Sequence, residues 1–334
     1  MRAIYLSLIA AILICPLLWS AMDEKSPPVH PGPLKIEAKP LPLDSSDPQR
    51  IMLGSLRYLG GWQLKSPNPA LGGISSMDVL PDQRFLALSD TGILFGFTIP
   101  IAASSPFVAP LPLRAMDLPK AKDLWDTESM TRDPATGQYW VGFEMVQRIC
   151  RYAPEFARAQ ACVDRPEMKD WPITGGPEAM ARLPDGRFVA FGETAPGPKG
   201  GNDMLLFPSD PVAPGGSPKA IRMSYIPPQG YVPTDAVWIG NNRLLMLNRR
   251  VTLFDGFTAV ITMLDISDMH KDAVLRPQEI ARLAPPVLAD NFEAMAVEKR
   301  DGQSILWIAS DDNHMFFQRT LLLKFALPPE LELE

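Results

Sequence analysis

Acidic side chains recur at matching places in five similar segments of this sequence. Each segment starts with a short or acidic residue, continues through two apolar runs separated by a polar turn, and ends with a charged residue. Carboxylate oxygens are preferred ligands of hard cations such as calcium, and paired carboxyl groups can act as general acid and base. The ten residues at the ends of the segments are Ser75 and Asp90, Glu128 and Glu144, Glu178 and Glu193, Asp235 and Arg250, and Glu293 and Asp311.

Each segment is predicted to form a β-hairpin, because turn residues separate its two short apolar runs. Consecutive segments start 50 to 58 residues apart, which leaves room for four strands in each repeat. A four-stranded repeat of this length is typical of a β-propeller. We therefore expect an all-β fold of five four-stranded blades, with six blades as the alternative if one degenerate blade is hidden.

The two ends of the repeat region are expected to close the ring. The fifth hairpin is followed by one strand, RTLLLKFAL, and its missing partner is GSLRYLGGWQL before the first hairpin. Pairing of these N- and C-terminal strands removes the open sheet edge. The propeller is thus expected to span residues 51–328, followed by a tail over 329–334.

The sequence before the propeller indicates export. Arg2 precedes an apolar run to Trp19, so residues 1–21 are predicted to be a signal peptide, with an uncleaved membrane anchor as the alternative. Residues 22–50 are rich in proline and are expected to form an extended linker. A periplasmic or secreted monomer follows, or a protein anchored to the membrane and facing the periplasm.

Two cysteines follow the signal region, Cys150 and Cys162. They lie on what resemble neighbouring strands of one hairpin, and export places them in an oxidising compartment. A disulfide is the preferred interpretation, and two reduced buried thiols are the alternative.

In a propeller the first strand of each repeat faces the central channel, so the ten end residues are expected to converge near one mouth. Converging carboxylates repel each other unless a cation, arginines or raised pKa values compensate. Arg249 and Arg250 offer partial compensation, so a calcium site is a reasonable inference. The competing interpretation is that each acid only hydrogen-bonds to a neighbouring backbone.

A further polar cluster, Asp311-Asp312-Asn313-His314, follows a strand at a position where propeller loops often carry function. His314 is a candidate general base or metal ligand, and an ordinary polar turn is the alternative. The candidate catalytic residues are Glu178, Glu293 and His314, the candidate substrate-binding residues are Arg250 and Asn313, and the candidate metal ligands are Asp90, Glu128, Glu178, Glu293, Asp311 and Asp312.

Composition and missing motifs exclude other classes. With 36 prolines among 334 residues a helical bundle is not expected, and a net charge of −6 argues against nucleic-acid binding. The sequence has no GxSxG elbow, no Walker motif, no dinucleotide fingerprint and no EF-hand loop. We therefore expect no organic cofactor, and any calcium site must be built from dispersed residues.

Several segments resemble the family described as esterase-like activity of phytase. They are GGISSMDVLPDQRFLALSDTG, ESMTRDP, GPEAMARLPDGRFVAFGE, NFEAMAV and ASDDN…QRTLLLKFAL. The resemblance implies an exported propeller that hydrolyses phosphate or carboxylic esters with calcium dependence. The positions that match its motifs are Asp90, Glu128, Glu178, Glu293, Asp311, Asp312 and Asn313.

Two departures from the family pattern are His314-Met315, where an aromatic residue is expected, and the fourth repeat with Asp235 and Arg250. No lysine–arginine cluster is visible along the chain, so calcium would have to bridge the phosphates of an anionic substrate.

Two functions therefore compete. One is a metal-assisted phosphoesterase or esterase that acts on a small-molecule ester. The other is a non-catalytic propeller that binds a small ligand, a polysaccharide or an envelope partner, with structural acids or one structural cation.

Overall fold

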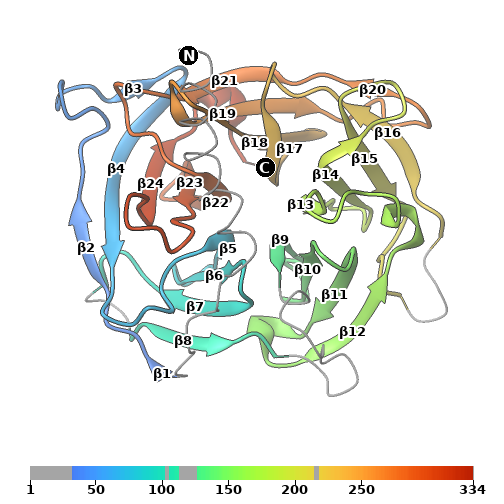
Figure 1. Ribbon diagram of the computed structural model, residues 1–334, viewed down its shortest axis with the longest axis horizontal. Coiled ribbons are helices and arrows are strands. Elements are labelled where there is room, and N and C mark those ends of the chain that lie inside the picture. Colours follow the sequence, from blue (N-terminus) through green and yellow to red (C-terminus); the bar gives the residue numbers. More distant parts are fainter. Residues whose placement is uncertain (1–31, 102–104, 113–125, 214–217, 334) are drawn as a thin grey trace, which may run out of the picture.

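Five antiparallel sheets stand around a central channel in the computed structural model (Figure 1). The structure describes residues 32–101, 105–112, 126–213 and 218–333. Each sheet contains a four-stranded meander, and its first strand lies at the channel. The expected five-bladed propeller is confirmed.

The first three blades follow one another along the chain. Blade 1 contains β5 (Ile74–Val79), β6 (Phe85–Ser89), β7 (Ile93–Phe97) and β8 (Phe107–Pro110). Blade 2 contains β9 (Thr127–Arg132), β10 (Tyr139–Phe143), β11 (Arg148–Tyr152) and β12 (Ala159–Asp164). Blade 3 contains β13 (Pro177–Arg182), β14 (Phe188–Pro196), β15 (Asn202–Phe207) and β16 (Ile221–Tyr225).

The last two blades complete the ring. Blade 4 contains β17 (Val232–Gly240), β18 (Arg243–Thr252), β19 (Gly256–Asp265) and β21 (Gln278–Leu283). Blade 5 contains β22 (Phe292–Arg300), β23 (Gln303–Ser310), β24 (Leu321–Ala326) and β4 (Leu56–Lys65). Because β24 pairs antiparallel with β4, the predicted closure by N- and C-terminal strands is confirmed.

Short strands extend three of the blades at their outer edges. They are β1 (Gly32–Pro33) on β8, β2 (Glu37–Pro40) and β3 (Met52–Leu53) on β4, and β20 (Val274–Leu275) on β16. The described part of the proline-rich segment thus lies against blades 1 and 5, with Leu34 and Leu43 buried. The predicted signal region lies outside the described residues.

Helical structure in the described ranges consists of three short 3-10 turns, η3 (Pro154–Phe156), η4 (Pro166–Met168) and η5 (Pro329–Leu331). None of the helices in these ranges has the length and apolar character needed to cross a membrane.

The core lies between neighbouring blades, because both faces of each sheet are covered. Phe85 of blade 1 packs edge-on against Trp307 of blade 5, with ring centroids 4.8 Å apart. Trp140 of blade 2 meets Phe188 of blade 3 at the same separation of 4.8 Å. Aromatic pairs of this geometry add about 1 kcal/mol beyond the burial of their surface, so blade contacts fix the ring.

Cys150 and Cys162 form a disulfide, as predicted. The two residues are direct partners across the β11–β12 ladder, so the bond joins strands that are already paired.

Replacement of both cysteines by alanine is expected to lower the free energy of unfolding by about 3 kcal/mol. This is the chain-entropy value for a loop of about 15 residues, which the disulfide closes in the unfolded chain. Guanidinium denaturation of the double variant measures the effect, and wild-type protein in reductant serves as the control. Equal free energies for oxidised wild type and the variant would contradict the prediction.

Candidate functional site

A β-bulge near the start of every inner strand marks one end of the channel, called here the mouth. In each blade the pairing between the first and second strands skips one residue at this end. A bulge leaves that residue out of the ladder and redirects its side chain. The skipped residues are Ser75, Glu128, Glu178, Thr234 and Glu293.

The fourth repeat is shifted by one residue from its expected alignment. Its bulged residue is Thr234. The residue at the mouth end of its second strand is Arg249, which pairs with Val232. The expected equivalence of Asp235 and Arg250 with the other repeats is therefore wrong. A shift of one residue along a strand turns the side chain to the opposite face. The sequence alignment therefore placed two side chains on the wrong side of the blade.

Asp235 and Arg250 make contacts away from the mouth carboxylates. The carboxylate of Asp235 is buried and accepts the N–H groups of Ala236, at 2.7 Å, and Met295, at 2.5 Å. It therefore links blade 4 to blade 5. Arg250 lies over the ring of Tyr231 and ion-pairs with Asp255 at 3.1 Å, so the structure does not bring it into the mouth cluster.

Five carboxylates at the mouth form two overlapping groups. Within each group, three ligand oxygens lie within 4.8 Å of one another, which is close enough for one cation to contact all three. Glu144 belongs to both groups. The first group is Asp126, Glu128 and Glu144, and the second is Glu144, Glu178 and Glu193.

Burial and mutual repulsion raise the pKa values of the carboxyl groups in this cluster. The pKa of Glu128 is raised well above its usual range by burial and by the charges of Glu178 and Asp126. Burial likewise raises the pKa of Glu144 to about 8. Burial and the charges of Glu193 and Glu144 raise the pKa of Glu178, which shares a side-chain hydrogen bond with Glu144.

The donor set fits a hard cation. A cation placed between these closely spaced carboxyl groups would stabilise their ionised forms. Oxygen is also the ligand atom that calcium prefers. Asp126, Glu128, Glu144, Glu178 and Glu193 are the residues that would hold such a cation.

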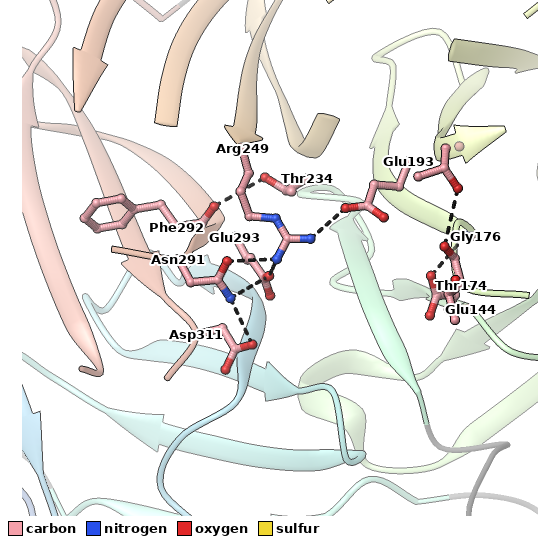
Figure 2. Close-up of polar contacts among 12 residues, drawn as sticks. Glu144, Thr174, Gly176, Glu193, Thr234, Arg249, Asn291, Phe292, Glu293 and Asp311 are labelled. Atoms are coloured by element: carbon pink, nitrogen blue, oxygen red, sulfur yellow. Dashed lines mark hydrogen bonds and ion pairs between the residues drawn. The ribbon is translucent and has the colours of Figure 1, made fainter. Parts of the chain in front are cut away.

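Arg249 forms the centre of a second polar network at the mouth (Figure 2). Its guanidinium ion-pairs with Glu193 at 2.6 Å and with Glu293, and it donates a hydrogen bond to Asn291 Oδ1 at 2.8 Å. Burial opposes its charge, but the combined attraction of Glu293, Glu193 and Glu178 raises its pKa. Arg249 thus connects blade 4 with blades 3 and 5.

Glu293 and Asp311 share Asn291. The side-chain amide of Asn291 donates to Glu293 Oε1 at 2.9 Å and to Asp311 Oδ2 at 3.3 Å (Figure 2). Burial raises the pKa of Glu293 even though Arg249 opposes that shift. Burial and the charges of Glu293 and Asp90 raise the pKa of Asp311 well above its usual range.

The side chain of Asp312 and the backbone of Asn313 form hydrogen bonds that stabilise the loop of the 311–314 cluster. Asp312 accepts the N–H of Gly73 at 3.1 Å and the hydroxyl of Thr320 at 2.7 Å, so its carboxylate is engaged in structural bonds. The backbone N–H of Asn313 donates to Asp311 Oδ1 at 2.6 Å. These contacts connect the blade 5 loop to the segment that enters blade 1.

His314 and Asp90 meet at Gly73, apart from the two groups of three carboxylates. Gly73 has a φ of +61°, and a Cβ added there would lie 2.4 Å from Asp90 Oδ1 and 3.4 Å from His314 Nε2. The glycine therefore makes room for both side chains. His314 Nε2 is buried without a hydrogen-bond partner among the described residues.

The structure adds Asp126 and Asn291 to the candidate site, and it pairs Arg249, which was expected to offset part of the acidic charge, with Glu193 and Glu293. Asp126 and Asn291 lie two residues before the bulged Glu128 and Glu293, a spacing visible in the sequence once the bulge position is known. The position of Arg249 at the mouth could be assigned only with the correct alignment of the fourth repeat. Of the predicted residues, Glu128 and Glu178 enter the carboxylate groups, whereas Glu293 and Asp311 lie in the Asn291 network.

The fold and the site define a five-bladed propeller with buried carboxylates at one mouth of its channel. The chain belongs to the Phytase-like family, described as esterase-like activity of phytase, whose model matches residues 69–314. This confirms the resemblance found in the sequence. A search of curated proteins gave no match.

Solved structures show more distant likenesses. The calcium-binding protein regucalcin from Agrobacterium tumefaciens is 13% identical, with 90% of this chain and 94% of that chain covered and a TM-score of 0.45. The structure of U3-55K is 8% identical, with 77% of this chain and 96% of that chain covered and a TM-score of 0.44. These likenesses carry no information about function.

Replacement of Arg249 by glutamine is expected to lower the free energy of unfolding by about 3–5 kcal/mol. Removal of one partner from a buried ion pair leaves the carboxylates of Glu193 and Glu293 uncompensated. The matched variant Arg250→Gln breaks a surface pair and should cost at most about 1 kcal/mol. Urea denaturation at neutral pH compares the two, and similar losses would show that Arg249 does not hold the mouth together.

Proposed function

We propose that the acidic mouth binds calcium and that the protein is an exported, metal-assisted hydrolase of small-molecule phosphate or carboxylic esters. The observation that carries the proposal is the pair of carboxylate groups that share Glu144 at the mouth of a propeller of the Phytase-like family. The disulfide fits an oxidising compartment and supports export.

The proposed cation site uses side chains from two adjacent blades. Asp126, Glu128 and Glu144 belong to blade 2, and Glu178 and Glu193 belong to blade 3. When bound, calcium would polarise the ester and bind water. Cation binding should release protons from Glu144 and Glu178, whose pKa values are raised, because a ligating carboxylate must be ionised.

Glu293 is the favoured group for proton transfer in this proposal. It lies on blade 5, is 8% exposed, and is oriented by the side-chain amide of Asn291 and by Arg249. Its raised pKa keeps it closer to neutral pH than a free carboxyl group, which suits a general acid or base. Arg249 is the side chain best placed to orient an anionic ester beside Glu293.

A second candidate function is binding without turnover. Its supporting observation is that the carboxylates already have partners within the fold. Glu178 and Glu144 share a side-chain hydrogen bond, and Glu293 is paired with Arg249 and Asn291. Under this alternative the mouth recognises a small ligand or holds one structural cation.

Calcium at a concentration one hundred times its dissociation constant is expected to stabilise the protein by about 2.7 kcal/mol. Glu144→Gln should abolish this gain, because Glu144 belongs to both carboxylate groups. Thermal melts of metal-free protein with and without calcium measure the effect. The control is Asp301→Asn, at an exposed turn between β22 and β23, and an undiminished calcium response in the Glu144 variant would place the cation elsewhere.

Calcium-loaded protein is expected to hydrolyse p-nitrophenyl phosphate or p-nitrophenyl acetate. Glu293→Gln should lower kcat by about 100-fold or more while calcium stabilisation is retained, because a proton-transfer group contributes roughly that factor. Asp301→Asn again serves as the control. Calcium binding without turnover of either ester would reject the hydrolase and favour the binding function.

A further inference from the structure

A basic cleft lies where blades 2 and 3 meet, lined by the segment that follows β12, by the start of β16 and by the segment before β20. Figure 1 shows β12, β16 and β20 on the outer side of the ring. The volume of the cleft is about 990 Å³, and it shares no lining residue with the carboxylate groups at the mouth. The cleft is lined by five cationic side chains and two acidic ones. The cations are Arg165, Lys169, Lys219, Arg222 and Lys271.

Three separate segments supply these cations, so no local pattern along the chain predicts the cluster. Lys169 follows η4, Lys219 precedes β16, and Lys271 precedes β20. The expectation that the chain lacks a lysine–arginine cluster is therefore wrong. The residues are distant along the chain and become neighbours only through the blade packing.

One side-chain and one backbone hydrogen bond hold the three segments together. Glu167 Oε1 accepts the N–H of Ala220 at 3.0 Å, which joins the η4 segment to β16. The N–H of Asp272 donates to the carbonyl of Arg222 at 2.9 Å, which joins the segment before β20 to β16. The backbone positions that carry the cations are thus fixed before any ligand arrives, which reduces the entropy lost on binding.

The floor and the rim of the cleft differ in their charge balance. Arg165 is 5% exposed and pairs with Glu167 at 2.9 Å, and Arg222 lies 3.4 Å from Asp203. The three lysines at the rim are exposed and have no ion-pair partner among the described residues. Arg165 Nε is buried without a hydrogen-bond partner in the same described ranges.

We propose that this cleft is a binding site for a phosphorylated small molecule that carries several negative charges. Three exposed lysines without an ion-pair partner in the described part of the chain attract a polyvalent anion more strongly than a monovalent one, because each negative charge can contact its own lysine. The volume suits a small molecule rather than a single inorganic anion. Nothing in this proposal depends on hydrolysis at the mouth.

The test is titration calorimetry of the metal-free full chain with inorganic tripolyphosphate. We expect one molecule to bind per chain, with an affinity that falls as salt is added. Inorganic phosphate should bind at least tenfold more weakly. Absence of tripolyphosphate binding, or equal affinity for both anions, would overturn the proposal.

Charge-matched variants locate the binding. The triple variant K169Q/K219Q/K271Q should weaken tripolyphosphate binding at least tenfold. The triple variant K35Q/K39Q/K65Q, which removes the same charge from exposed lysines outside the cleft, should bind as wild type does. Equal losses in both would reduce the effect to general electrostatics and would overturn the proposal.

The mouth variant Glu144→Gln separates this site from the proposed calcium site. It should bind tripolyphosphate as tightly as wild type, because the mouth and the cleft share no residue. A loss of binding in this variant would place the anion at the mouth and overturn the proposal. Unchanged thermal melts of the lysine variants confirm that they fold.

Discussion

Repulsion among buried carboxylates is the constraint on which the mouth of this propeller depends. Repulsion within a solvent-exposed ring of acids would cost the protein little stability. Here, however, four of the carboxylates are each less than 9% exposed, namely Glu144, Glu178, Glu293 and Asp311. Burial penalises every negative charge, and close neighbours add to that penalty. Three contacts offset this penalty: the hydrogen bond shared by Glu178 and Glu144, the half-buried guanidinium of Arg249, and the side-chain amide of Asn291. The first two connect different blades, whereas the Asn291 amide donates to Glu293 and Asp311 within blade 5.

The bulges explain how a repeated sequence produces an asymmetric site. All five inner strands carry the bulge at the same place, but the redirected side chain is a glutamate in blades 2, 3 and 5 and a hydroxyl in blades 1 and 4. The hydroxyls of Ser75 and Thr234 donate to the carbonyls of Thr127 and Phe292 in the next blade. Two blades therefore use the position to join the ring, and three use it to supply charge. The two carboxylate groups consequently lie on one side of the mouth, in blades 2 and 3, whereas Arg249 faces them from blade 4.

Much of the fold could be predicted from the sequence, because hairpin turns and apolar runs recur at a spacing that only four strands per repeat explain. The blade number, the strand pair that closes the ring and the disulfide all follow from local patterns. The site was less predictable. In the fourth repeat, the sequence pattern predicts Asp235 and Arg250 as the mouth residues, one position away from Thr234 and Arg249. That repeat has no acid at the bulge to guide the alignment, and strand alternation turns an error of one residue into an error of face. Segments that are distant along the chain bring Lys169, Lys219 and Lys271 to one cleft, and no local sequence pattern predicts such an arrangement.

The distribution of charge in this protein matters more than its sum. A net charge of −6 argues against nucleic-acid binding for the chain as a whole, yet the surface carries a cleft with five cations. Five carboxylates lie together at the channel mouth, and three exposed lysines line the cleft at the junction of blades 2 and 3. Because charges separated by more than about 10 Å in salt are largely screened from one another, each site acts on ligands within its own reach. Blades 2 and 3 thus contribute both to the proposed cation site and to the proposed anion site, with blade packing as the common support for the two.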